Sequence, residues 1–150
     1  MIERKSSREI AKQASAGAIV AETLALLREH AVPGVSTAAL DTIAERHIRR
    51  RGGVPTFKGF RGFPGSICAS PNDMIVHGIP GPYLLADGDV LSVDVGVTYR
   101  GFVGDSAVTF GIGTIDDTRR VNRPFSYRRK LPETHRCRGK KSYHVGAVQG

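Results

Sequence analysis

Cysteine and long hydrophobic runs are scarce in this chain of 150 residues. Its two cysteines, Cys68 and Cys137, form no Cys-x-x-Cys pair and lie in unlike surroundings, so the sequence indicates no disulfide framework. A reducing, cytoplasmic location fits this usage of cysteine. The longest apolar stretch, residues 16–27, is broken by Glu22 and Thr23, so we expect no secretion signal, no membrane-spanning helix and no membrane partner.

Acidic residues almost disappear after residue 117. Residues 1–117 contain 12 lysines and arginines against 13 acidic residues, a net charge of −1. Residues 118–150 contain 10 against one, Glu133, and their net charge of +9 accounts for the basic character of the whole chain. This tail has no helical or strand periodicity, so we expect one folded domain, 1–117, and a basic tail that is disordered or the product of a reading-frame shift.

Two helices are predicted before residue 54. Ser6 and Glu9 match a capping box, and the helix that they begin ends before Pro33–Gly34. A second helix begins near Ser36 and ends at Gly52–Gly53. The expected buried positions are Ile10, Ala14, Gly17, Ala21, Leu24 and Leu27 in the first helix, and Leu40, Ile43, Ala44, His47 and Ile48 in the second.

Further along the chain, two segments alternate between apolar and polar residues as the strands of a hairpin do. They are residues 90–98 and 102–110, and Arg100–Gly101 between them fits a tight two-residue turn. If Tyr99 pairs with Phe102, the register of the whole hairpin is fixed. A slip of one residue would move every side chain of one strand to the other face of the sheet.

This register places two aspartates on one face of the sheet. Asp94 falls opposite Ala107 and Asp105 opposite Gly96, which makes the aspartates diagonal neighbours with Cα atoms roughly 7–8 Å apart. Two such carboxylates suit one cation or a metal pair about 3.5–4 Å apart, and Gly96 leaves room for that site. Aspartates near hairpin ends also face solvent in many proteins, so spacing alone leaves a plain surface role open.

Upstream of the hairpin, residues 66–80 predict a short strand, a Pro-Asn-Asp turn and a further strand that ends at His77. Gly78 and Pro80 break the chain directly after this histidine. A neutral imidazole beside a loop can exchange hydrogen bonds or protons with a substrate near pH 7. A purely structural, hydrogen-bonding histidine is the alternative.

These motifs occur in order from near the start of the chain to about Phe110, and together they resemble the type I methionine aminopeptidases. In that family two similar α/β halves, the pita-bread fold, surround a dinuclear metal site that removes the initiator methionine from new polypeptides. The resemblance implies an α/β fold class: the N-terminal half of a pita-bread domain in residues 1–117, with two helices on a mainly antiparallel sheet and an irregular tail. The matching segments are 57–60, 62–64, 66–68, 76–80, 87–90, 93–96 and 104–105.

The resemblance also assigns roles to residues. It implies that Asp94 and Asp105 are metal ligands, with Asp105 bridging two divalent ions (Co, Mn, Fe or Zn), and that His77 is a catalytic and substrate-binding residue near the scissile amide. The methionine side chain would lie among Phe60, Phe63 and Cys68. Aromatic rings and a thiol favour a thioether, although two phenylalanines and a cysteine would otherwise be assigned to the core.

The chain departs from the family after Thr118. The family site has five ligands, and the last three, a histidine and two glutamates, come from the second half of the domain. Here only Glu133 remains among the acidic residues of the tail. Two carboxylates alone would hold at most a weak, hydrated Mg²⁺, so we expect this chain to be inactive or nearly so. The partners implied are the N-terminal methionine of nascent polypeptides and the ribosome.

Two other functions stay open at this point. The chain could be a non-catalytic binding protein whose basic tail, with Phe125, Tyr127 and Tyr143 among its cations, contacts RNA or the ribosome. We rank this nucleic-acid role second, because a charged tail without periodicity is usually only solvated. The chain could also be a superfamily member that cleaves at proline, against which the compact Phe60–Phe63–Cys68 motif argues.

Overall fold

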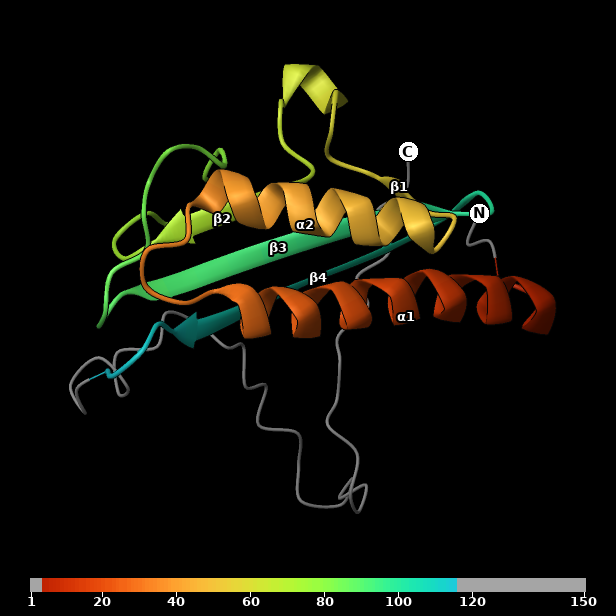
Figure 1. Cartoon of the computed structure of the whole chain (residues 1–150). Helices are drawn as coiled ribbons and strands as arrows, with labels where there is room; N and C mark the ends of the chain where they lie inside the picture. The colour runs from red at the N-terminus through yellow and green to blue at the C-terminus, as the bar shows by residue number, and fades with distance from the viewer. Residues whose placement is uncertain (1–3, 116–150) are drawn as a thin grey trace, which may run out of the picture.

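Two helices cover one face of a four-stranded antiparallel sheet in the computed structural model, which describes residues 4–115 (Figure 1). The predictions for the tail therefore lie outside the described residues. Strand β3 is central: β4 pairs along one of its edges, and β1 and β2 pair along the other. The elements are α1 (Ser7–His30), α2 (Thr37–Arg50), β1 (Val54–Pro55), a 3-10 turn (Phe60–Gly62), β2 (Ile67–Pro71), β3 (Val90–Tyr99) and β4 (Phe102–Gly111).

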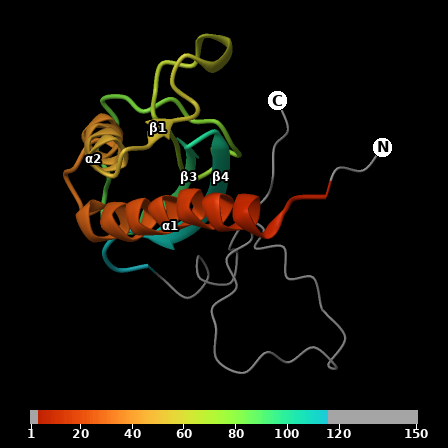
Figure 2. The ribbon, with the colours of Figure 1, turned by 90° about the vertical axis from the view of Figure 1, so that its right-hand side faces the viewer.

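Both helices begin and end where the sequence predicts. The hydroxyl of Ser6 accepts from the backbone N–H of Glu9, and the Glu9 carboxylate accepts from the backbone N–H of Ser6 at 2.7 Å, which completes the capping box. Ser36 caps α2 by accepting from the backbone N–H of Ala39 at 3.1 Å. In the view of Figure 2, α2 is seen nearly along its axis and α1 runs across the picture; the two helices contact each other and the sheet.

The buried stripe of α1 differs from the prediction. Ile10 is 56% exposed, although it lies seven residues before Gly17 and therefore on the side of α1 that contacts β4. There the small residues Ala16 and Gly17 touch the sheet so closely that a Cβ on Gly104 would lie 2.7 Å from the backbone nitrogen of Gly17. The side chains buried on α1 are those of Ala16, Ile19, Val20, Thr23, Leu24 and Leu27, and those on α2 are Thr37, Leu40, Ala44 and Ile48.

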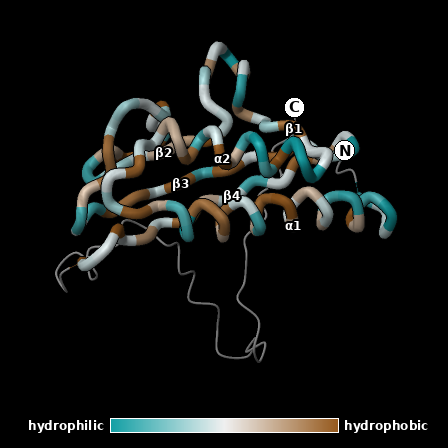
Figure 3. Tube along the Cα trace, in the orientation of Figure 1, coloured by the Kyte–Doolittle hydropathy of each residue, from teal (hydrophilic) through white to brown (hydrophobic). Residues whose placement is uncertain are grey.

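By length and composition alone, α1 is apolar enough to cross a membrane, which differs from the prediction that no segment does so. Figure 3 shows that α1 is hydrophilic near its N-terminal end and hydrophobic further along. The core helix of a soluble protein has the same composition, and here Val20, Leu24 and Leu27 pack on the sheet. Packing therefore accounts for these three residues, whereas Ile10 near the start of the helix is exposed.

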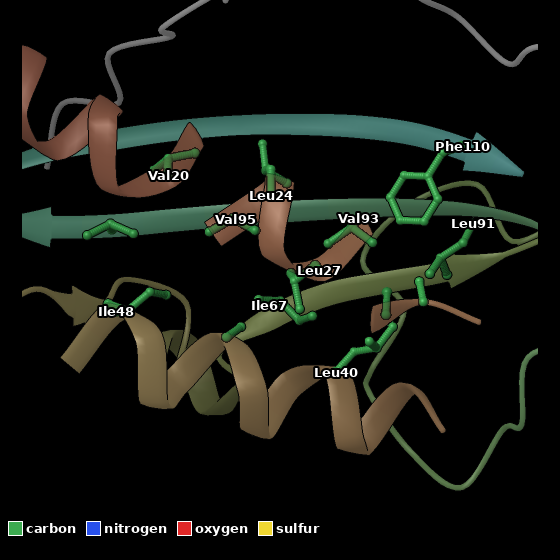
Figure 4. Packing of buried hydrophobic residues seen from close by; sticks show 14 of the residues in the cluster. Val20, Leu24, Leu27, Leu40, Ile48, Ile67, Leu91, Val93, Val95 and Phe110 are labelled. Carbon is green, nitrogen blue, oxygen red and sulfur yellow. The ribbon is translucent and has the colours of Figure 1, made fainter. Parts of the chain in front are cut away.

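The core lies between the helices and the sheet (Figure 4). Alternate residues of β3, namely Leu91, Val93, Val95 and Val97, point into it and are fully buried. Burying each such side chain stabilises the fold by roughly 1.5–3 kcal/mol. The residues between them point to the opposite face of the sheet, so the core fixes which face carries the polar side chains of this strand.

The predicted strand ending at His77 is wrong. After β2 the described chain forms no further strand before β3, and Met74, Ile75 and Val76 are exposed. The physical reason is the backbone, because Asn72 and His77 both adopt left-handed conformations, with φ of 55° and 58°. Such residues interrupt an extended chain, and the apolar run between them does not join the sheet.

Candidate functional site

The β3–β4 hairpin has the register that the sequence predicts. Tyr99 pairs with Phe102, and the ladder continues without a bulge to Val90 and Gly111. The turn residues Arg100 and Gly101 both have positive φ, 49° and 79°, as a tight hairpin turn of the type that matches strand twist requires. The predicted pairing of the two aspartates rests on this turn.

Asp94 and Asp105 lie on the same face of the sheet, away from the helices. Asp94 pairs with Ala107 on β4 and with Cys68 on β2, and Asp105 pairs with Gly96. The two carboxyl groups are close enough to share a hydrogen bond. The diagonal placement deduced from the alternation is therefore confirmed, whereas the role of these residues stays a prediction.

The sequence predicts room for a metal above Gly96, but in the structure an aromatic ring fills this space. A Cβ on Gly96 would lie 2.6 Å from a ring carbon of Phe57. The Phe57 ring thus lies against Gly96, the residue that pairs with Asp105. Phe57 belongs to one of the segments that match the family, and the recurrence of phenylalanine every three residues at 57, 60 and 63 was the signal that could have assigned it to the pocket.

One pocket of about 610 Å³ brings together all the residues predicted for the site. His77 lines this pocket from the loop that joins β2 and β3, and its side chain is exposed. The pocket lies on the same face as the aspartates, opposite the helical layer. It is lined by Phe60, Phe63, Cys68, His77, Asp94 and Asp105, and also by Phe57, Arg61, Gly62, Pro64 and Ile79.

The electrostatics of the pocket favour a bound cation. Burial, the charge of Asp105 and the hydrogen bond to it raise the pKa of Asp94 to about 7. Burial, followed by the charges of Asp94 and Asp105, raises the pKa of the Cys68 thiol to about 11, so this thiol is neutral at pH 7. The Asp94 Oδ1 atom is buried without a hydrogen-bond partner in the described part of the chain. Two adjacent carboxylates with an unsatisfied oxygen are suited to a divalent ion.

The described residues supply only part of a metal site. Within residues 4–115 no group of three or more histidine, cysteine, aspartate or glutamate side chains is placed to hold a metal ion. Asp94 and Asp105 therefore fit two positions in the coordination sphere of a divalent cation and leave the others to different donors. His77 lines the pocket without completing such a cluster.

The sequence is similar to a known protein family and to several of its members. Residues 11–125 match the model of metallopeptidase family M24. The chain is 50% identical over 117 residues to methionine aminopeptidase 1 of Bacillus subtilis, which covers 78% of this chain and 47% of that protein. It is 47% identical over 118 residues to methionine aminopeptidase 1 of Mycobacterium tuberculosis, covering 78% and 44%.

Solved structures agree with this result. The structure of methionine aminopeptidase from Thermotoga maritima matches with a TM-score of 0.78 and 36% identity, over 81% of this chain and 49% of that one. The structure from Rickettsia prowazekii matches with a TM-score of 0.79 and 31% identity, over 81% and 49%. The two helices on an antiparallel sheet are thus the fold of this family, and the chain spans about half the length of the relatives that it matches.

Proposed function

We propose, because the chain belongs to metallopeptidase family M24, that residues 1–117 form the N-terminal half of a methionine aminopeptidase catalytic domain. The reaction is the metal-dependent hydrolysis of the peptide bond after an N-terminal methionine. The observation that carries this proposal is the convergence of Asp94, Asp105 and His77 on one pocket. The substrates are the N-terminal methionines of nascent polypeptides, the setting is the cytoplasm, and the ribosome is a partner.

Asp94 and Asp105 would hold the divalent ions that the family implies, which are Co, Mn, Fe or Zn. When bound, such ions supply Lewis acidity and lower the pKa of water toward neutrality. The buried Asp94 Oδ1, which lacks a hydrogen-bond partner within residues 4–115, would be available as an oxygen ligand for such ions. His77, which also lines the pocket, would hydrogen-bond near the scissile amide.

The aromatic side of the pocket selects the methionine side chain. Phe60, Phe63 and Cys68 line it, and the neutral Cys68 thiol presents sulfur instead of a charge. Phe57 adds a third ring, packed over Gly96. A flexible, polarizable thioether makes favourable contacts with such rings.

Activity requires ligands that the described half does not contain. Two carboxylates leave most of the coordination sphere open, so the chain alone binds a cation weakly and hydrolyses peptide bonds little or not at all. Residues 118–150 lack the glutamate pair that the family uses. The functional role of this half is therefore to supply two metal ligands and the methionine pocket.

Equilibrium titration of the full chain with Mn²⁺ tests this proposal, with hydrolysis of a Met-Ala peptide measured in parallel. We expect weak Mn²⁺ binding that is lost in Asp94→Asn and in Asp105→Asn, and no hydrolysis above that of a His77→Ala, Asp105→Ala double variant. Asp73→Asn is the matched control, because Asp73 is exposed and lies outside the pocket. Equal Mn²⁺ binding in all three asparagine variants would refute the assignment.

The charge asymmetry of the chain supports a second candidate. A non-catalytic binding protein could use the basic tail, 118–150, to contact RNA phosphates or the ribosome. A gel shift with RNA that weakens steeply with salt and disappears on deletion of residues 118–150 would favour it. Retention of the shift by residues 1–117 would exclude the tail as the binding element.

A further inference from the structure

His77 sits in a backbone conformation that few residues other than glycine adopt. Its φ is 58°, in the left-handed region, and it follows three exposed apolar residues. Residues held in this region cluster at functional sites, where the surrounding structure enforces them. Contacts with the rest of the fold must therefore keep His77 in this conformation, and the hydrogen bonds of the next residue identify them.

The backbone of Gly78, the next residue, fixes the position of His77. Its carbonyl oxygen accepts from the backbone N–H of Ala69 at 2.9 Å, and its N–H donates to the hydroxyl of Ser70 at 3.0 Å. A Cβ at Gly78 would collide with the carbonyl oxygen of Ala69, so only glycine allows this approach to β2. Among the hydrogen bonds of the described chain, these two are the ones that hold residues 75–80.

The two ends of the surrounding segment are fixed independently. The Asn72 side chain donates to Asp89 at 2.9 Å, and the Tyr83 hydroxyl donates to the same carboxylate at 2.9 Å. The backbone N–H of Asn72 donates to Val90 at 2.7 Å. These bonds close the base of the segment but do not reach His77, whose position depends on Gly78.

Ser70 is placed to act on His77 and not on a substrate. It lies on β2 two residues after Cys68, and therefore on the pocket face of the strand, opposite Ser92 of β3. Its side chain is buried, with 4% exposure, and it does not line the pocket. Its hydroxyl contacts the described chain at the amide next to His77.

We propose that Ser70 is a positioning residue of this site. By accepting the Gly78 N–H, its hydroxyl holds His77 in the left-handed conformation that brings the imidazole to the pocket. Because Cys68 and Ser70 share one strand, the pocket wall and the histidine keep a fixed relation. The importance of this relation rests on the proposed function, which gives His77 its role at the substrate.

The test compares Ser70→Ala, Ser70→Val and Ser70→Thr by NMR of the full chain. Valine and threonine have the same shape, so this pair isolates the hydroxyl. We expect Gly78 amide exchange to accelerate about tenfold or more in the alanine and valine variants, with shifted His77 backbone and imidazole resonances. Threonine should restore both signals to their wild-type values.

Ser92→Ala is the control, since Ser92 lies beside Ser70 on the same face but bonds to Thr109. It should leave Gly78 and His77 unchanged. Unchanged His77 signals in the valine variant would overturn the proposal, and so would global unfolding of the alanine and valine variants, which would make Ser70 a residue of general stability. Mn²⁺ binding by Asp94 and Asp105 should survive in Ser70→Ala, so failure here is distinguishable from failure of the proposed function.

Discussion

The β3–β4 hairpin and the segment 72–89 bring side chains to the same pocket, but different forces hold them. The hairpin places Asp94 and Asp105 through a continuous ladder and a row of fully buried side chains beneath it. The segment places His77 through the two hydrogen bonds of one glycine, and its apolar side chains are exposed. The aspartate side of the pocket therefore belongs to the packed sheet, whereas the histidine side is held locally.

Truncation of one apolar side chain in each region should give the largest contrast. Leu91 on the hairpin is fully buried, so Leu91→Ala should lower the free energy of unfolding by about 2–5 kcal/mol. Ile75 on the segment is 88% exposed, so Ile75→Ala should change it by less than about 0.5 kcal/mol. Urea unfolding monitored by circular dichroism measures both. A similar loss of unfolding free energy in the two variants would contradict the difference in packing between the hairpin and the segment.

Crowding Gly78 should have an intermediate and local effect. Gly78→Ala forces a Cβ into the carbonyl of Ala69, and we expect a loss of about 1–3 kcal/mol, with faster amide exchange at residues 69 and 78. Gly81→Ala is the control, because its nearest contact would be 3.8 Å away. The hairpin amides should keep their protection. If protection falls throughout β3 and β4 instead, the segment and the hairpin are one unit.

The pH dependence of stability should report the buried hairpin carboxylate. The pKa of Asp94 is raised to about 7, above the ordinary value near 4 that it has when unfolded. Between these values the folded state binds the additional proton, so this stability contribution is complete below about pH 4 and is lost as the pH rises through 7. Asp94→Asn should flatten this decline in metal-free buffer.

Melting temperatures at pH 5 and pH 8 with a chelator measure this smaller effect. Asp41, whose pKa burial also raises, contributes with the same sign in every variant, so the comparison is between slopes. Asp73→Asn should retain the wild-type slope. An identical slope in Asp94→Asn would show that the carboxylate pair does not carry the pH dependence.

The hairpin was predictable from sequence because its information is local. Alternation along residues 90–98 selects the buried face, and the two-residue turn at Arg100–Gly101 sets the register. The helix boundaries were predictable for the same reason, since Ser6, Glu9 and Ser36 act on amides within three residues. The candidate metal-ligand pair therefore follows from the chain itself.

The remainder of the site depends on contacts between distant residues. The apolar run 74–76 resembles a strand, but the hydrogen bonds of Gly78 to β2 and the left-handed His77 decide its course. On α1 the periodicity correctly turns Gly17 toward the sheet, where it lies against Gly104, but it does not reveal that Ile10 on the same stripe stays exposed. The position of Phe57 over Gly96 likewise follows from the loop before β2.

Paramagnetic broadening by Mn²⁺ in NMR spectra of the full chain tests the cation-binding face most directly. We predict that substoichiometric Mn²⁺ broadens the amides of Asp94, Asp105 and Cys68 first, and that Asp105→Asn abolishes this pattern while Asp73→Asn preserves it. Broadening that instead follows the exposed acidic residues Asp73 and Asp87, with the amides of the hairpin centre unaffected, would contradict a cation site formed by the two strands.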